Sequence, residues 1–489
     1  MWALWISLAA AGEDFEGQSY YLGELHSHTG ASGDGGSSDL GGCSSECGAV
    51  ADLGTTAREL GLDFMAVTDH VNGPASATAQ NYAQVLAALL GAHDPEGGLV
   101  TIPGAEIWLR WPDGSAVGHK DLLFFDDDTA LLQTLRMGDN QPFGDTSLTL
   151  DDCDALWTWM AELEARLGPA LLLPHHPALS QPMETDWTCH SDAYSPGVEI
   201  YSTHGNSLSD PTDYDPGWSP AVPESTVESA LNLGLTLGFL GGTDTHDTRP
   251  GAVCAQDPEQ PDHPYGGSLT VVVAPQDQSL SRGLIHQAIL DRRTYTTTGP
   301  LVPVRVEWRV DGASVGGHGA APDVPQDRDL GLVLQVPVPW AADVSSVRLR
   351  GPGAWWTADA SAEGTWTWSL PAAELPPWLY VDVTLDGEQP DGCVDGGDDT
   401  LEHLWLSPVR PTLGPAVGPG ETGAPADSRG QDSPPTDSAG GEQARCSGCG
   451  ALPAPARWGW GLIGAITLGW RRRVLSATEP RRAVDNRSL

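Results

Sequence analysis

Histidines and carboxylates recur along the first half of this chain, each placed just after a short apolar run. Such side chains are common ligands of divalent cations in proteins. In chain order, the motifs are His26-Ser-His28, Asp69-His70, Glu106, His119, His175-His176 and Asp244-Thr-His246. Ligands at the ends of successive buried strands can converge on one point, as they do at one end of a barrel. The series therefore predicts a centre that binds more than one metal ion.

The motifs supply different kinds of ligand. His26 and His28 are two residues apart at a strand end, so both can project from one side of the strand. Glu106 is expected to bridge two cations, because a carboxylate has two oxygens and a neutral imidazole has one free nitrogen. Cations held in this way would lower the pKa of a bound water to give a hydroxide nucleophile, and would polarise an ester oxygen. That chemistry is hydrolysis without a serine or cysteine nucleophile.

Three further residues near these motifs are expected to assist. His204 and Arg249 are candidates to protonate or neutralise the leaving group. A structural hydrogen bond for His204 and a surface position for Arg249 are equally good interpretations. Asp69, next to His70, is expected to orient a ligand rather than to bind metal.

Apolar runs and helical patterns alternate before residue 250. Seven runs are expected to be strands: 20–25, 64–68, 99–103, 122–125, 170–173, 198–201 and 235–240. Segments between them have apolar residues three and four apart, as amphipathic helices do, at 48–60, 79–90 and 156–167. Alternating strands and helices predict a parallel sheet. With ligands at the strand ends, the pattern predicts a distorted (β/α)7 TIM-like barrel over residues 20–300.

The chain changes character after the expected barrel. Residues 301–409 alternate apolar and polar side chains between Gly and Pro turns, which predicts a small all-β sandwich domain. Residues 410–445 are rich in Gly, Pro, Ser and Asp and are expected to be a disordered linker. Residues 1–19 begin with an apolar stretch and are expected to be a short signal peptide and leader, although they lack a basic n-region.

A Cys motif, a short apolar span and an Arg cluster follow the linker, at 446–473. This combination resembles the C-terminal sorting signals of the MYXO-CTERM type, and the resemblance implies processing by a sorting protease. An ordinary C-terminal membrane anchor gives the same orientation, because the Arg cluster stays in the cytoplasm with the tail at 474–489. We therefore expect an exported protein at the cell surface or outer membrane, with its catalytic domain outside the cytoplasm.

Acidic residues greatly outnumber basic ones. The chain has 66 Asp and Glu against 24 Lys and Arg, a formal net charge of −42 at pH 7. Binding to nucleic acid depends on Lys and Arg that neutralise phosphates, so the composition disfavours stable nucleic-acid binding. The acidity otherwise fits a solvated surface in a salty or extracellular setting.

The eight cysteines also fit an exported protein. Cys43 and Cys47 lie close together in a Gly/Ser-rich loop. We expect a disulfide there rather than a metal site, because no second cysteine pair with suitable spacing follows in the folded part. The spacing assigns no partners to the remaining four of this part, Cys153, Cys189, Cys254 and Cys393.

Together, the metal-ligand motifs resemble those of the PHP (polymerase and histidinol phosphatase) superfamily of metal-dependent hydrolases, over residues 20–250. The resemblance implies two to three divalent metal ions (zinc, manganese or iron) in a distorted (β/α)7 barrel. Carried over motif by motif, the nine ligands are His26, His28, Asp34, His70, Glu106, His119, His176, Asp244 and His246. Asp34 stands where many members have His. His176 is preferred to His175 because the family motif reads His-Pro, and the choice between them stays open.

A narrower resemblance involves Gly197-Val-Glu199-Ile-Tyr201 with the residues that follow, and the later segment Arg292-Arg293-Thr-Tyr295 with its Thr-Gly end. These segments are similar to the CehA/McbA-type branch of the superfamily, whose named members cleave an aryl carbamate.

We therefore expect a metal-dependent hydrolase that acts on a small-molecule ester, in the first place a phosphoesterase, the commonest activity that the superfamily implies. The narrower resemblance supports the alternative of a carbamate or carboxylic ester hydrolase. A third interpretation is a non-catalytic surface protein that binds through its β domain. Against it, none of the nine ligand positions has an apolar residue.

Overall fold

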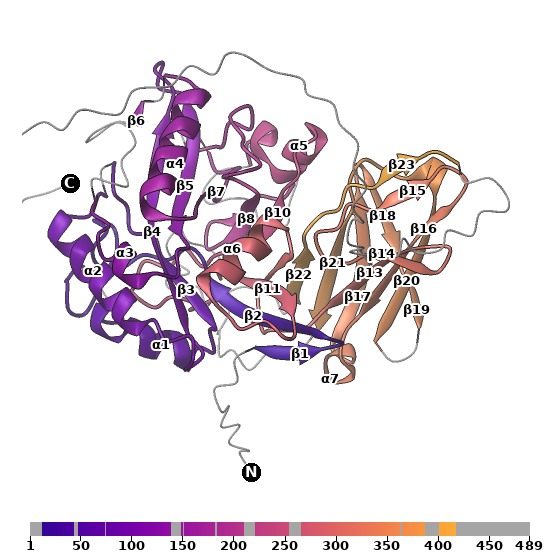
Figure 1. Ribbon diagram of the computed structural model, residues 1–489, viewed down its shortest axis with the longest axis horizontal. Coiled ribbons are helices and arrows are strands. Elements are labelled where there is room, and N and C mark those ends of the chain that lie inside the picture. Colours follow the sequence, from indigo (N-terminus) through magenta and orange to yellow (C-terminus); the bar gives the residue numbers. More distant parts are fainter. Residues whose placement is uncertain are drawn as a thin grey trace, which may run out of the picture. The chain divides into compact units, whose positions relative to one another are not determined.

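A mixed sheet of 13 strands dominates the computed structural model (Figure 1), in the order β18-β17-β21-β22-β12-β11-β2-β3-β4-β5-β7. Two strands lie off this path: β1 pairs with β2, and β6 pairs with β4. The bounds are β1 Glu13–Phe15, β2 Gln18–Glu24, β3 Phe64–Val67, β4 Val100–Arg110, β5 Ala116–Phe124, β6 Leu148–Thr149, β7 Ala170–Pro174, β11 Leu269–Pro275, β12 Thr294–Thr297, β17 Val344–Gly351, β18 Ala354–Thr357, β21 Tyr380–Asp386 and β22 Leu401–Leu406.

The structure describes residues 12–43, 47–73, 75–137, 148–149, 151–180, 183–209, 221–253, 266–361, 364–386 and 401–416. The apolar N-terminal stretch, most of the expected linker, the Cys motif with its apolar span, and the tail lie outside these ranges, as do Cys254 and Cys393. The expectations about them stay predictions. None of the helices in the described ranges is long and apolar enough to cross a membrane.

The expected (β/α)7 barrel is wrong. In the large sheet only the pairs β2–β3, β3–β4 and β4–β6 are parallel, and the described strands form open sheets rather than a closed barrel. The clearest departure is the antiparallel pairing of β4 with β5. A Pro112-Asp113-Gly114 turn connects these strands where a barrel would need a helical crossover. Such a turn reverses the chain within a few residues, and Gly114 has the positive φ of 90° that this reversal requires.

Three smaller sheets complete the described structure. One has the order β10 (Gly238–Gly241), β8 (Gly197–Ser202), β9 (Gly205–Asn206), and its β8–β10 pair is parallel. A five-stranded sheet has the order β14 (Ala313–Gly316), β13 (Arg305–Val310), β16 (Asp329–Gln335), β20 (Thr365–Pro371), β19 (Asp359–Ser361). The third pairs β15 (Asp323–Pro325) with β23 (Thr412–Gly414). The C-terminal β region therefore has its own five-stranded sheet, but its strands β17, β18, β21 and β22 continue the large sheet through the β12–β22 pair.

Helices flank the N-terminal part of the large sheet (Figure 1). The described α-helices are α1 Leu53–Glu59, α2 Ala79–Ala92, α3 Thr129–Leu132, α4 Cys153–Leu167, α5 Val227–Asn232, α6 Arg282–Leu290 and α7 Val338–Ala341. Helices α2 and α4 lie where the apolar spacing predicts them, and each begins at a side chain that accepts a backbone N–H, Thr78 for α2 and Asp152 for α4. The expected disulfide Cys43–Cys47 is present, and a second one joins Cys153 to Cys189.

An aromatic cluster ties the C-terminal β region to the small β8–β9–β10 sheet. Trp378 and Tyr380 pack with Phe239 of β10 and with residues of β8 and α5. Glu228 of α5 accepts two hydrogen bonds from Arg350, at 2.8 and 2.9 Å, and one from Tyr380 at 3.1 Å. Apolar burial and charge-assisted hydrogen bonds thus reinforce one another at this junction.

Trp378 is one of three tryptophans in this cluster and is completely buried. We predict that Trp378→Ala lowers the free energy of unfolding by about 3–5 kcal/mol, because it removes a large apolar side chain and leaves a cavity. Urea denaturation followed by circular dichroism measures the loss. The control Val338→Ala, at a side chain that is 69% exposed, should stay within about 0.5 kcal/mol of wild type. Equal losses for the two variants would contradict the packing argument.

Asp63, at the start of β3, links stability to pH. Its carboxylate accepts backbone N–H groups of Leu22 and Gly12, each at 2.9 Å, but burial dominates and raises its pKa to about 7. The unfolded chain has the ordinary pKa of about 3.9. The folded state therefore holds this proton more tightly, and the stabilisation is fully present below pH 4 and lost as pH rises toward 7.

We predict that Asp63→Asn, which has no carboxyl to ionise, becomes more stable relative to wild type as pH rises from 4 to 7. Melting temperatures of both proteins across this range provide the measurement. Asp277→Asn, at an exposed position, is the control and should follow the wild-type curve. A constant difference between Asp63→Asn and wild type over the range would show that Asp63 is already ionised at pH 4.

Candidate metal centre

Chain segments from several strand ends meet at one buried point. The loop after β2 carries His26 and His28, and the loop after β10 carries Asp244 and His246. These loops lie side by side although their strands belong to different sheets, because the His28 N–H donates to the Thr245 carbonyl at 2.7 Å. The Asp244 N–H likewise donates to the His26 carbonyl at 2.8 Å. Two backbone hydrogen bonds therefore fix one side of the site.

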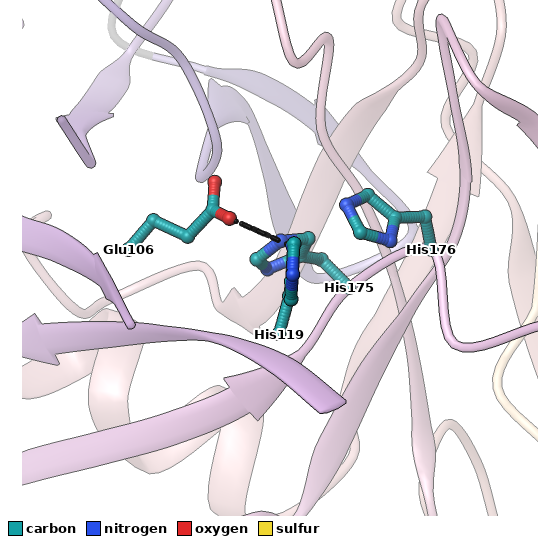
Figure 2. Close-up of side chains that lie close together, drawn as sticks. All are labelled: Glu106, His119, His175 and His176. Carbon is teal, nitrogen blue, oxygen red and sulfur yellow. Dashed lines mark ion pairs between the residues drawn. The ribbon is translucent and has the colours of Figure 1, made fainter. Parts of the chain in front are cut away.

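Glu106, within β4, forms the middle of the site and is only 2% exposed. One carboxylate oxygen, Oε1, lies 3.0 Å from His119 Nδ1 and 3.3 Å from His175 Nε2 (Figure 2). It also lies 3.3 Å from His70 Nδ1 and accepts a 2.7 Å hydrogen bond from Trp108 Nε1. This oxygen therefore faces three imidazoles.

The other oxygen of Glu106 faces a different pair of histidines. Oε2 lies 3.2 Å from His28 Nε2 and 3.4 Å from His26 Nε2. Both nitrogens are also 3.3 Å from Oδ1 of Asp244. Each oxygen of Glu106 thus faces a different group of histidines. A carboxylate that bridges two cations would have this geometry.

A third group lies toward solvent. His28, His70 and His246 bring one potential ligand nitrogen each within 4.8 Å of one another, and the rings of His28 and His246 are stacked at 4.2 Å. Asp34 extends the group, with Oδ2 3.2 Å from His70 Nε2 and Oδ1 3.9 Å from His246 Nε2. Asp34 is 44% exposed, so the site meets solvent on this side.

The adjacent histidines after β7 both belong to the site. His175 is fully buried between Glu106 and Asp121, and its Nδ1 lies 3.2 Å from Asp121 Oδ2. His176 packs its ring against those of His175 and His204, with centroids 4.3 and 4.9 Å apart. The structure therefore brings both members of the pair to the centre.

Of the residues expected to assist, His204 lies in the centre. Arg249 makes no contact with the clustered histidines and carboxylates among the contacts of the described residues. His204 Nε2 is 3.0 Å from Asp244 Oδ2. Arg249 is 40% exposed and donates from Nε to Asp247 at 2.6 Å. Asp69 acts through an intermediate: it accepts a 2.9 Å hydrogen bond from Ser32 Oγ, which in turn lies 3.3 Å from His28 Nδ1.

Two carboxylates of the site were not assigned from the sequence. Asp121 and Glu199 lie beside the Nδ1 atoms of histidines, Asp121 at His175 and Glu199 at His26, with the latter contact at 2.8 Å. A carboxylate that accepts the Nδ1 proton leaves Nε2 free to bind a cation. Asp121 could have been found from its spacing, since it is two residues after His119 and thus on the same face of β5.

The charges of the centre favour cations. Burial would raise the pKa of Glu106, but the surrounding histidines, His70 first, hold it well below its usual range. Burial would likewise lower the pKa of His28, yet its contacts with Asp244 and Glu106 outweigh burial and raise the pKa to about 10. For His119 burial prevails and lowers the pKa to about 4, which keeps its imidazole neutral and ready to bind metal.

Five carboxylates gather here: Asp34, Glu106, Asp121, Glu199 and Asp244. Their ion-pair partners in the described part of the chain are histidines, and none is an arginine or lysine. Buried carboxylates need compensating positive charge. These buried His, Glu and Asp groups therefore fit divalent cations, with borderline nitrogen and hard oxygen ligands in one place.

Comparisons with known proteins add no family to this picture: no protein-family model matches the chain, and no curated protein matches its sequence. The resemblance to PHP hydrolases therefore stands on the motifs themselves.

We predict that the protein retains divalent cations and that they stabilise it. A cation that binds only the folded state adds about 2.7 kcal/mol when its free concentration is about 100 times its Kd. Equilibrium dialysis against Zn²⁺ or Mn²⁺ with elemental analysis gives the stoichiometry, and calorimetry with and without EDTA gives the stabilisation. His28→Ala should lose metal, whereas His190→Ala, beside Asp192 and away from the ligands, should not. Wild type that retains no metal would refute the assignment.

Proposed function

We propose that this protein is a metal-dependent hydrolase of small-molecule esters, with phosphoesters as its first substrate class. The proposal rests on the position of Glu106. Its two carboxylate oxygens face separate groups of histidines in a buried site. Two or three divalent cations, zinc, manganese or iron, would supply Lewis acidity and an activated water there. The similarity of the motifs to those of PHP hydrolases supports the same class.

The protein's own residues hold and orient this site. Glu106 and Asp244 each present two oxygens to different groups of histidines, and in this arrangement each would hold cations on both sides. Glu199 orients His26 through a hydrogen bond to Nδ1, and Asp121 supplies a negative charge 3.2 Å from Nδ1 of His175. Asp34 and His246 lie at the solvent side, where a substrate can approach without displacing the buried ligands.

The segment Gly197–Ser202, which is β8, favours a second candidate, a carbamate or carboxylic ester hydrolase of the CehA/McbA type. Its Glu199 lies 2.8 Å from His26 Nδ1, so one residue of the narrower resemblance lies beside the clustered histidines. Both reactions need polarisation of an ester oxygen and attack by water, and the same ligands serve both. The choice depends on which substrate the protein turns over.

We predict that the metal-loaded protein hydrolyses at least one of three matched aryl substrates, a phosphomonoester, a phosphodiester or a carbamate, and that EDTA abolishes turnover. Asp244→Asn should lower kcat by about 100-fold or more, since even substitutions behind the ligands cost 10–100-fold in metalloenzymes. Asp192→Asn, at a side chain that is 72% exposed, is the matched control and should keep wild-type activity.

The relative rates on the three substrates distinguish the two candidate reactions. Metal binding without turnover of any substrate would instead favour a non-catalytic binding protein. Turnover that survives both EDTA and Asp244→Asn would exclude the metal mechanism.

A further inference from the structure

The adjacent histidines His175 and His176 point to different surroundings. Their rings are almost perpendicular, with an interplanar angle of 87°. His176 has a positive φ of 30°, a backbone conformation that residues other than glycine rarely adopt. Both residues follow the end of β7 at Pro174, and their side chains enter different groups of residues.

His175 belongs to the Glu106 side of the centre. Its Nε2 faces Glu106 Oε1 at 3.3 Å and its Nδ1 faces Asp121 Oδ2 at 3.2 Å, so both ring nitrogens have carboxylate neighbours. The ion pairs of Glu106 with the histidines drawn in Figure 2 are those to His119 and His175, and no dashed line joins Glu106 to His176.

His176 lies instead beside His204 and Asp244. These three residues bring one potential ligand atom each within 4.8 Å of one another, and all three are buried. His176 Nδ1 has no hydrogen-bond partner among the described residues, although it is shielded from solvent. A buried nitrogen without a partner is costly, and a bound cation would satisfy it.

Asp244 connects this group to the rest of the centre in the same way that Glu106 connects its own two groups. Oδ1 of Asp244 faces His26 and His28, both at 3.3 Å. Oδ2 faces His204 Nε2 at 3.0 Å. The two oxygens therefore point to two different sets of nitrogens, which is the arrangement expected of a second bridging carboxylate.

We propose that His176, His204 and Oδ2 of Asp244 form a separate position for a divalent cation, so that the adjacent histidines bind different ions. Two imidazoles and one carboxylate with open coordination positions suit Zn²⁺ or a similar borderline cation. His204 is then a metal ligand rather than the proton donor for a leaving group. The proposal is independent of which bond the protein cleaves.

A competing assignment places His176 with Glu106, His119 and His175, since these four can also gather around one ion. The distances argue against it. Glu106 Oε1 already has His119 at 3.0 Å and His175 at 3.3 Å, and the described ion pairs of Glu106 do not include His176. The two assignments predict different losses of metal when histidines are substituted in pairs.

The test is metal stoichiometry, measured by equilibrium dialysis of the full chain against Zn²⁺ alone, followed by elemental analysis. His176→Ala and His204→Ala should each lose the same one equivalent, so the double variant should lose no more than either single variant. His175→Ala combined with His204→Ala should lose two. Melting temperatures in EDTA show whether each variant folds like metal-free wild type. If His204→Ala does not, His204→Gln replaces it.

Two results would overturn the proposal. One is a full complement of zinc in His204→Ala and His204→Gln. The other is a loss of one equivalent in the variant with both His175→Ala and His176→Ala, which would place both histidines on a single ion. Because zinc is counted rather than turnover, a protein without hydrolase activity can still pass this test.

Discussion

The buried carboxylate of Glu106 is the constraint around which the rest of this site is built. An ionised carboxylate away from water is stable only when positive charge or several donors surround it. Here the partners come from distant parts of the chain, from the loop after β2, the end of β3, the facing strand β5 and the loop after β7. The fold must therefore bring these segments together before the charge on Glu106 can be buried.

Strand register performs much of this assembly. β4 and β5 pair so that Glu106 lies opposite Asp121 and Trp108 lies opposite His119. One hairpin thus supplies Glu106, the histidine His119 and Asp121, whose carboxylate lies beside His175. An isolated parallel β-bridge between His70 and Glu106 brings the segment after β3 alongside β4. A slip of one residue in this hairpin would turn these side chains to the opposite face of the sheet.

The sequence predicted which residues lie together better than it predicted the fold. His and carboxylate motifs at strand ends are visible in a sequence whatever the order of the strands, and the residues expected as ligands do lie together. The barrel failed because the extent of β4 is not visible: the apolar run ends at 103, but the strand continues to Arg110 and turns back as a hairpin. Glu106 therefore lies inside a strand rather than after one.

Other features depend on contacts that no local pattern reveals. Glu199 is a single carboxylate in an apolar strand, and only its place opposite His26 gives it a role. The difference between His175 and His176 depends on their neighbours in space, Glu106 and Asp121 for His175, and His204 and Asp244 for His176. The strands of the C-terminal β region join the large sheet through the pairing of β12 with β22, which lie more than 100 residues apart in sequence.

The C-terminal β region also has a structural link to the metal centre, through β10. Phe239 of β10 packs in the aromatic cluster with Trp378, and its N–H donates to Ser407 Oγ at 2.8 Å. Gly242, three residues later, lies so close to the centre that a Cβ there would be 2.5 Å from Glu199 Oε2 and 2.6 Å from His26 Cβ. Asp244 follows two residues after Gly242. Only four residues separate Phe239, which packs in the aromatic cluster, from Asp244, whose N–H donates to the His26 carbonyl at 2.8 Å. The C-terminal β region therefore packs, through β10, against the segment that leads to Asp244.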